Sequence, residues 1–181
     1  MNDNYNHSAE AQVHYWELQQ YNEGHLVGRW FTLDGLTKEE HREEVQNWLK
    51  ELTNSEENTE GNLYEEWILG DAEGVPAEYV DTYGIDEDFF KLQEAVSGSC
   101  YGIEVFKAGI ALGIDLDKIT EAYYGQFEDD EDFARGYADG TGMFDGVPDY
   151  VRMYFDYESF GRDLTINDYM EEDGYYFSRH W

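Results

Sequence analysis

Residues 37–52 have the sequence TKEEHREEVQNWLKEL, which combines a helix start signal with a single apolar stripe. Thr37 and Glu40 form a capping-box pattern, because their side chains can bond the free backbone N–H groups at a helix start. The stripe consists of four apolar residues spaced three, one and three apart: Val45, Trp48, Leu49 and Leu52. The segment therefore predicts an amphipathic helix that must cover another layer of the fold.

The flanking segments supply that layer. Residues 12–21 and 25–33 are rich in aromatic and β-branched side chains, and Asn22-Glu23-Gly24 between them has turn chemistry, which predicts a β-hairpin. After a polar loop at 54–61, residues 62–69 predict a third strand. Residues 12–75 are thus expected to form an N-terminal α/β module, preceded by a flexible extension over 1–11.

Residues 76–124 predict a module of short helices. Asp86 is placed to cap the first helix, and Gly113 can end the second, which contains Phe106. A third short helix around 116–123 would close at Gly125. The apolar stripe of the first helix is spaced four, three and four: Ile85, Phe89, Leu92 and Val96.

Residues 125–181 predict a C-terminal α/β module. The acidic run 128–132 suits a helix N-terminus, and Pro148 suits the first turn of the next helix. That second helix is expected to bury Val151, Tyr154 and Phe155, and segments 164–170 and 175–180 predict a closing hairpin. The expected fold class is α+β, in which two modules with short antiparallel sheets and helices flank a helical middle.

The charge is the most informative property of the composition. The 181 residues include 42 acidic and 11 basic ones, which gives a net charge of −31, yet 17% are aromatic, which is too many for a disordered acidic chain. Direct binding to nucleic acid is disfavoured, because it requires basic side chains on phosphates. Duplex DNA carries one charge per ~1.7 Å, so this charge matches about 53 Å, or roughly 15 base pairs.

Motifs of catalysis and of cofactor binding are not found. The five histidines have no metal-ligand spacing, and EF-hand loops counted from Asp115 or Asp130 have Thr120 or Arg135 where glycine is needed. A phosphate-binding loop and a nucleophile elbow are both missing from the sequence. We therefore expect a protein that is not an enzyme, without catalytic residues, cofactor or metal.

The remaining composition indicates a cytoplasmic protein. Cys100 is the single cysteine, so an internal disulfide is impossible and a reducing compartment fits. The N-terminus has no apolar core of a signal peptide, and no stretch approaches the ~20 apolar residues of a membrane span.

Two segments resemble a known family. Residues 21–31, YNEGHLVGRWF, resemble the N-terminal YN-x-G-x-x-x-G-x-WF hairpin of ArdA antirestriction proteins. Residues 147–164, VPDYVRMYFDYESFGRDL, are similar to the antirestriction region of that family, in which a VP turn leads into a helix and then DY-E-x-(F/Y)-(A/G)-RDL. The resemblance covers the chain from about residue 13 to its C-terminus.

The resemblance implies an elongated chain that forms a homodimer through its C-terminal module, and a dimer that mimics bent duplex DNA. Such a dimer would occupy the basic DNA groove in the methyltransferase core of type I restriction-modification enzymes and inhibit restriction, and modification as well. Genes of this family travel on plasmids, transposons and phages. We expect no direct contact with nucleic acid or membranes.

The candidate site residues fall into two sets. The expected DNA-mimic surface consists of Glu39, Glu40, Glu43, Glu44, Glu51, Asp86, Glu87, Asp88, Glu128, Asp129, Asp130, Glu131 and Asp132. The expected dimer interface and antirestriction region consists of Met143, Phe144, Val147, Pro148, Val151, Met153, Tyr154, Phe155 and Tyr157.

Three alternatives remain open. An acidic module could instead sequester another basic DNA-binding protein, which would keep the surface and change the target. Paired carboxylates such as Glu65 and Glu66 could serve a glycosidase, although among 42 acids some pair always looks suitable. Halophilic adaptation would account for the charge, but it would not account for the motifs at 21–31 and 147–164.

Overall fold

The computed structural model describes residues 10–181 and has an α+β fold, which confirms the predicted class. Its contacts divide the chain into two compact units, Met1–Ser97 and Gly98–Trp181. This boundary falls inside the stretch 76–124, so the finer organisation into three modules stays a prediction. The flexible extension expected over 1–11 lies almost wholly outside the described residues, and at its end Ala11 is buried, its carbonyl accepting a hydrogen bond from the Leu33 N–H.

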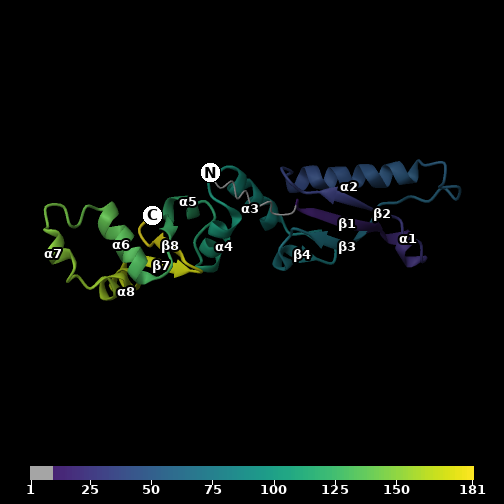
Figure 1. Ribbon diagram of the computed structural model, residues 1–181. Coiled ribbons are helices and arrows are strands. Elements are labelled where there is room, and N and C mark those ends of the chain that lie inside the picture. Colours follow the sequence, from purple (N-terminus) through teal and green to yellow (C-terminus); the bar gives the residue numbers. More distant parts are fainter. Residues whose placement is uncertain (1–9) are drawn as a thin grey trace, which may run out of the picture. The chain divides into compact units, whose positions relative to one another are not determined.

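The first unit is built on a three-stranded antiparallel sheet covered on one face by a helix (Figure 1). The strand order is β2-β1-β3, and Val13 lies opposite Phe31, so the predicted hairpin pairing is confirmed. The strands and the short helix in the hairpin connection are β1 Gln12–Glu17, α1 Leu18–Asn22, β2 Gly28–Thr32 and β3 Trp67–Glu73.

The first strand is shorter than predicted. It ends at Glu17, where we expected strand to residue 21, because the buried Glu17 carboxylate accepts hydrogen bonds from the N–H groups of Gln19 and Gln20 at 3.1 and 2.7 Å. These bonds satisfy free donors at the start of α1 and therefore favour a helical turn over continued strand. The third strand, predicted over 62–69, is displaced toward the C-terminus and covers Trp67–Glu73.

The covering helix α2, Lys38–Thr53, confirms the central prediction. Thr37 and Glu40 form the reciprocal capping box, and the first three residues of the predicted stripe are buried together with His41. Leu52, the fourth, is partly buried and packs against the same core. The stripe therefore fixes which side of α2 faces the sheet and leaves the opposite side to solvent.

Four short elements come after β3 in the sequence and complete the first unit. Asp86 caps α3 as predicted, because its carboxylate accepts the Asp88 N–H at 2.8 Å, and Phe89 and Leu92 are buried. The elements are η1 Ala77–Tyr79, β4 Val80–Asp81, β5 Gly84–Ile85 and α3 Glu87–Ser97.

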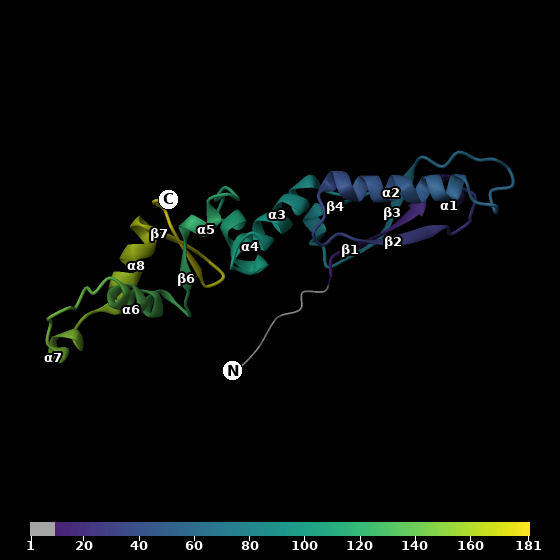
Figure 2. The same ribbon diagram turned by 90° about the horizontal axis from the view of Figure 1, so that it is seen from above.

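The second unit has another three-stranded antiparallel sheet, with order β6-β8-β7, beside two helices that lie side by side (Figures 1 and 2). Gly161 on α8 permits their contact, since a Cβ there would lie 2.0 Å from the backbone oxygen of Asp130. Phe133, Leu164 and Tyr176 form a buried core cluster of this unit. The elements are α4 Ile103–Ala111, α5 Ile119–Ala122, β6 Tyr123–Gln126, α6 Asp130–Gly140, α7 Asp149–Arg152, α8 Tyr157–Asn167, β7 Tyr169–Glu172 and β8 Tyr175–Ser178.

Three predictions for the second unit were wrong in detail. Tyr123 does not continue a helix but begins β6, which pairs with β8 across about fifty residues of chain. Residues 164–167 are the end of helix α8, so the closing hairpin begins only at Tyr169. The apolar face of α7 is not buried, since Val151 and Tyr154 are exposed and only Phe155 is partly buried.

Candidate functional site

The acidic residues are spread over both units and are largely unneutralised. The first unit has 23 acidic and 5 basic residues, a difference of 18 negative charges, and the second has 19 and 6, a difference of 13. Within residues 10–181, lysines and arginines form ion pairs with only seven carboxylates. Each unit therefore presents a strongly negative surface of its own.

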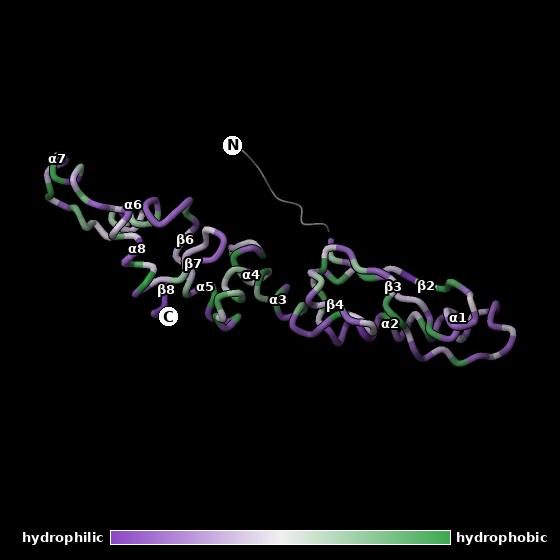
Figure 3. The backbone as a smooth tube through the Cα atoms, turned by 90° about the horizontal axis from the view of Figure 1, so that it is seen from below, coloured by the Kyte–Doolittle hydropathy of each residue, from purple (hydrophilic) through white to green (hydrophobic). Residues whose placement is uncertain are grey.

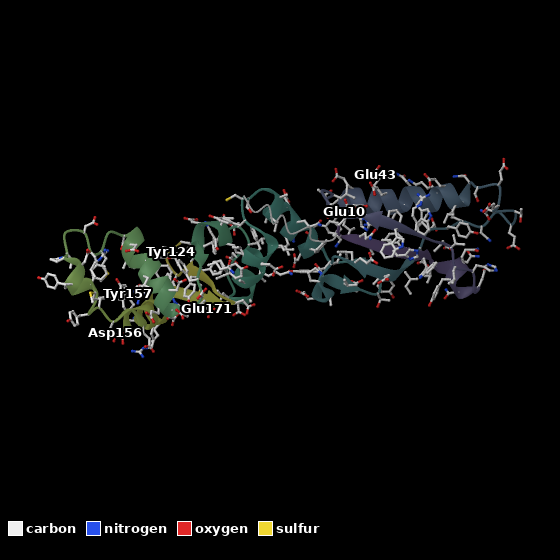
Figure 4. The ribbon with its side chains drawn as sticks, viewed as in Figure 1. Glu10, Glu43, Tyr124, Asp156, Tyr157 and Glu171 are labelled. Atoms are coloured by element: carbon white, nitrogen blue, oxygen red, sulfur yellow. The ribbon has the colours of Figure 1, made fainter. Side chains whose placement is uncertain are left out.

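On α2 all five predicted glutamates are exposed. Helix geometry places Glu40, Glu44 and Glu51 along one flank, because residues spaced four and seven apart return to nearly the same side. Glu43 projects on the side away from the sheet (Figure 4). Glu44 and Glu51 also line a groove of about 530 Å³ between α2 and β2, where Arg29 pairs with Glu51 at 3.2 Å.

The predicted acids at the start of α3 are exposed but partly neutralised. Lys91 contacts both Glu87 and Asp88 at 3.0 Å, and Asp86 is engaged as the helix cap. The hydrogen bonds to these carboxylates raise the pKa of Lys91, so the ammonium stays charged. This cluster therefore has a smaller net charge than its three carboxylates suggest.

The acidic run 128–132, at the start of α6, combines structural and exposed carboxylates. Asp129 caps the helix by accepting the Asp132 N–H at 2.8 Å, and Glu131 pairs with Arg135. Asp130 is partly buried and accepts hydrogen bonds from the hydroxyls of Tyr176 and Thr165 at 2.9 and 3.3 Å. Asp130 is therefore fixed to the core of the unit, while Glu128 and Asp129 remain exposed at its surface.

Folding adds acids that sequence reasoning missed. Glu158 in the first turn of α8 and Glu171 on β7 join the acidic run at the start of α6 around a groove of about 540 Å³ that also contains Arg162. The signal for Glu158 was present: Asp156 precedes apolar residues at 157, 160 and 164, a helix start with one buried face. Glu171 could not be found this way, because its hairpin is brought to the start of α6 by the pairing of β8 with the distant strand β6.

The predicted interface residues surround α7, where the chain is rich in apolar residues (Figure 3). Phe144, Phe155 and Tyr157 pack together, with ring centroids of neighbours 4.9 to 6.1 Å apart. Exposed fractions of Met153 and Tyr154 are 81% and 87%. The α7 surface, defined as the exposed residues Met143, Pro148, Tyr150, Val151, Met153 and Tyr154, thus rests on a partly buried aromatic cluster. Tyr150 was not among the predicted residues.

The histidines do not form a metal site among the described residues. His41 is buried against Tyr15, whose hydroxyl lies 3.1 Å from its Nε2, and burial lowers the pKa of His41 to about 4. A group of three or more metal-ligating side chains does not occur within 10–181. Over the same residues, no helix combines the length and apolar character needed to cross a bilayer.

Comparison with protein families shows which family the chain is part of. The model of the family described as "Antirestriction protein (ArdA)" matches residues 16–177, which is nearly the whole chain. No curated protein matches the chain. The match includes the two motif segments 21–31 and 147–164, helix α2, and helices α6 and α8 of the second unit. The chain therefore belongs to the ArdA family of antirestriction proteins.

Proposed function

We propose that this antirestriction protein acts as a DNA mimic that occupies the DNA-binding groove in the methyltransferase core of type I restriction-modification enzymes. The observation that carries the proposal is the excess of exposed carboxylates fixed on folded elements of both units. Inhibition would then need no catalytic step, since a bound mimic excludes DNA. The target is a bacterial enzyme of the cytoplasm, and we place this protein there as well.

The physical basis is that DNA enzymes grip phosphates through contacts that carry no sequence information. Glu40 and Glu44 are four residues apart, about 6 Å along the helix, and Glu51 follows about 10 Å further on. These distances are close to two and three base-pair steps of ~3.4 Å along one DNA strand. A carboxylate row of this kind offers the charges of a phosphate row without bases, so enzymes of different sequence specificity can be blocked.

The proposed contact residues are the thirteen acids predicted from the sequence, with different weights. The five acids on α2 are exposed along one long helix and are the strongest candidates: Glu39, Glu40, Glu43, Glu44 and Glu51. Glu40 also serves the capping box and Glu51 also pairs with Arg29, and both side chains remain exposed. Glu128 and Asp129 are joined by Glu158 and Glu171, which border the same groove. The other six acids bind cations, backbone N–H groups or hydroxyl groups within the protein and would contribute less: Asp86, Glu87, Asp88, Asp130, Glu131 and Asp132.

We further propose that the α7 surface joins two copies into a homodimer. Large side chains such as Tyr154 and Met153 are unusual in such exposed positions, and contiguous apolar surface of this kind marks contact sites. Phe144, Val147, Phe155 and Tyr157 lie beneath it and would support the contact. A dimer would double the charge presented to one enzyme.

Competition binding tests the function. Purified type I methyltransferase core is titrated with the full chain, with and without duplex DNA, at two salt concentrations. We expect mutually exclusive binding of protein and DNA, and weaker protein binding at the higher salt because exposed charges are screened. A ternary complex with DNA would refute mimicry, whereas binding to other basic DNA-binding proteins with equal affinity would favour general sequestration over a type I target.

A further inference from the structure

The sheet of the first unit has a second face that the proposed function does not use. Along β1, Val13 and Tyr15 point into the core beneath α2, so the alternating residues Gln12, His14 and Trp16 point to the opposite face. The strand register places Trp30 of β2 directly opposite His14. His14, Trp16 and Trp30 therefore share one face of the sheet.

The three rings form a compact platform. The His14 ring centroid lies 4.3 Å from that of Trp16 and 5.2 Å from that of Trp30, both in edge-to-face geometry. Gly28 and Gly70 on the neighbouring strands make room for the first two rings, since a Cβ at either position would lie about 2.6 Å from their atoms. The glycines thus allow these rings to lie across the sheet, while Trp30 stays 41% exposed.

Carboxylates border the platform on the β3 side. Asp71 lies opposite His14 in the sheet register, and Glu73 lies opposite Gln12, whose side-chain amide donates to it at 2.8 Å. Desolvation lowers the pKa of His14 against the opposing effect of Asp71, so the imidazole is largely uncharged at neutral pH. This face therefore combines aromatic rings with carboxylates, and none of the residues named here supplies a positive charge that would neutralise them.

We propose that this aromatic platform, defined as His14, Trp16 and Trp30 with Asp71 and Glu73, binds an arginine side chain presented by a basic protein partner. A guanidinium group stacks on an indole face and bonds carboxylates in its own plane, which an ammonium group does less well. A phosphate or an acidic peptide would be repelled by the two carboxylates. The inference is independent of the proposed function, because it concerns the sheet face opposite α2.

The test uses the full chain and blocked octapeptides of arginine or of lysine. The five tryptophans give five indole N–H signals in a nitrogen–proton correlation spectrum, which single Trp→Phe variants assign. We expect the arginine peptide to shift the Trp16 and Trp30 signals, and to bind about 2- to 5-fold more tightly than the lysine peptide. Trp30→Ala should abolish this preference, and Trp30→Phe, which retains a ring, should reduce it.

Tyr83→Ala is the matched control, because Tyr83 is a 72% exposed aromatic residue of the same unit outside the platform. It should leave the arginine preference unchanged, and Asp71→Asn should weaken binding of both peptides. The proposal is overturned if neither indole signal shifts, or if wild type binds both peptides equally. Either result would leave the competition between protein and DNA for the methyltransferase core unaffected, so the two hypotheses fail separately.

Discussion

The glutamate row on α2 gives the sharpest test of mimicry, through the triple substitution Glu40→Gln, Glu44→Gln and Glu51→Gln. All three side chains are exposed, and glutamine has nearly the same shape without the charge. Glutamine at position 40 can still serve the capping box with Thr37, so the helix start is preserved. The fold should therefore survive while three charges of one row are lost.

The expected effect on binding follows from the exposure of these groups. An exposed ion pair contributes about 0.2–1 kcal/mol, so three contacts to a basic groove contribute roughly 0.6–3 kcal/mol to the free energy of binding. That range corresponds to about a 3- to 150-fold rise in the Kd for the methyltransferase core. Among residues 10–181 the substitutions remove one ion pair, between Arg29 and Glu51, and both partners are largely exposed, so the melting temperature should change little.

The matched control is Glu56→Gln, Glu57→Gln and Glu60→Gln in the loop before β3, which removes the same charge from exposed positions of the same unit. The Kd of each variant is measured by titration of the core at low and moderate salt. The row variant should bind more weakly than the loop variant, and its salt dependence should be shallower. Equal losses in both would mean that net charge alone drives binding, which would refute the ordered row.

Three further predictions concern stability and assembly. Burial lowers the pKa of His41 from 6.5 to about 4, so below pH 6.5 the folded state binds fewer protons than the unfolded state. The free energy of unfolding should therefore be highest above pH 6.5 and fall by roughly 3 kcal/mol toward pH 4. Urea melts at a series of pH values should show a weaker pH dependence for His41→Gln. Gly161→Ala should cost about 1–3 kcal/mol in denaturant melts, because its Cβ would meet the Asp130 backbone, whereas Gly140→Ala, with only the Tyr124 hydroxyl at 3.6 Å, should be neutral or stabilising. Met153→Glu with Tyr154→Glu should convert a dimer to a folded monomer in sedimentation velocity, since both side chains are exposed within each copy, and a wild-type monomer at micromolar concentration would contradict the proposed interface.

Local signals accounted for the parts of the fold that were predicted well. The capping box of Thr37 and Glu40 and the cap at Asp86 depend on residues within one helical turn, so their pattern determines their structure wherever the segment is placed. The apolar stripe of α2 was equally local. The candidate acids on that helix followed at once, because the buried stripe decides which positions face solvent.

Long-range contacts decided the parts that were not predicted. Strand β6 is four residues long, and Tyr123 takes strand conformation because β8, more than fifty residues away, supplies its partner Phe177. Val151 and Tyr154 have the spacing of a buried helix face, but spacing cannot say whether the surface that covers them belongs to the same chain. Glu17 was unexpected for a related reason, since a buried carboxylate is stable only with specific donors around it.

The position of the acids also explains how a chain of charge −31 can remain folded. Each helix from α2 to α8 has at least one acidic residue in its first turn, where the free N–H groups and the helix dipole favour negative charge. Acids in these positions stabilise the fold, while those further along a helix, such as Glu44 and Glu51, have no such role.

Two kinds of acid should therefore respond differently to neutralisation. Asp129→Asn keeps a competent cap and removes one charge, whereas Asp129→Ala also loses the bond to the Asp132 N–H and should cost about 1 kcal/mol of stability. Glu44→Gln should change binding and leave stability alone. If Glu44→Gln destabilised the protein as much as Asp129→Ala, the acids would be structural throughout, and their exposure would no longer argue for a surface selected to meet a basic groove.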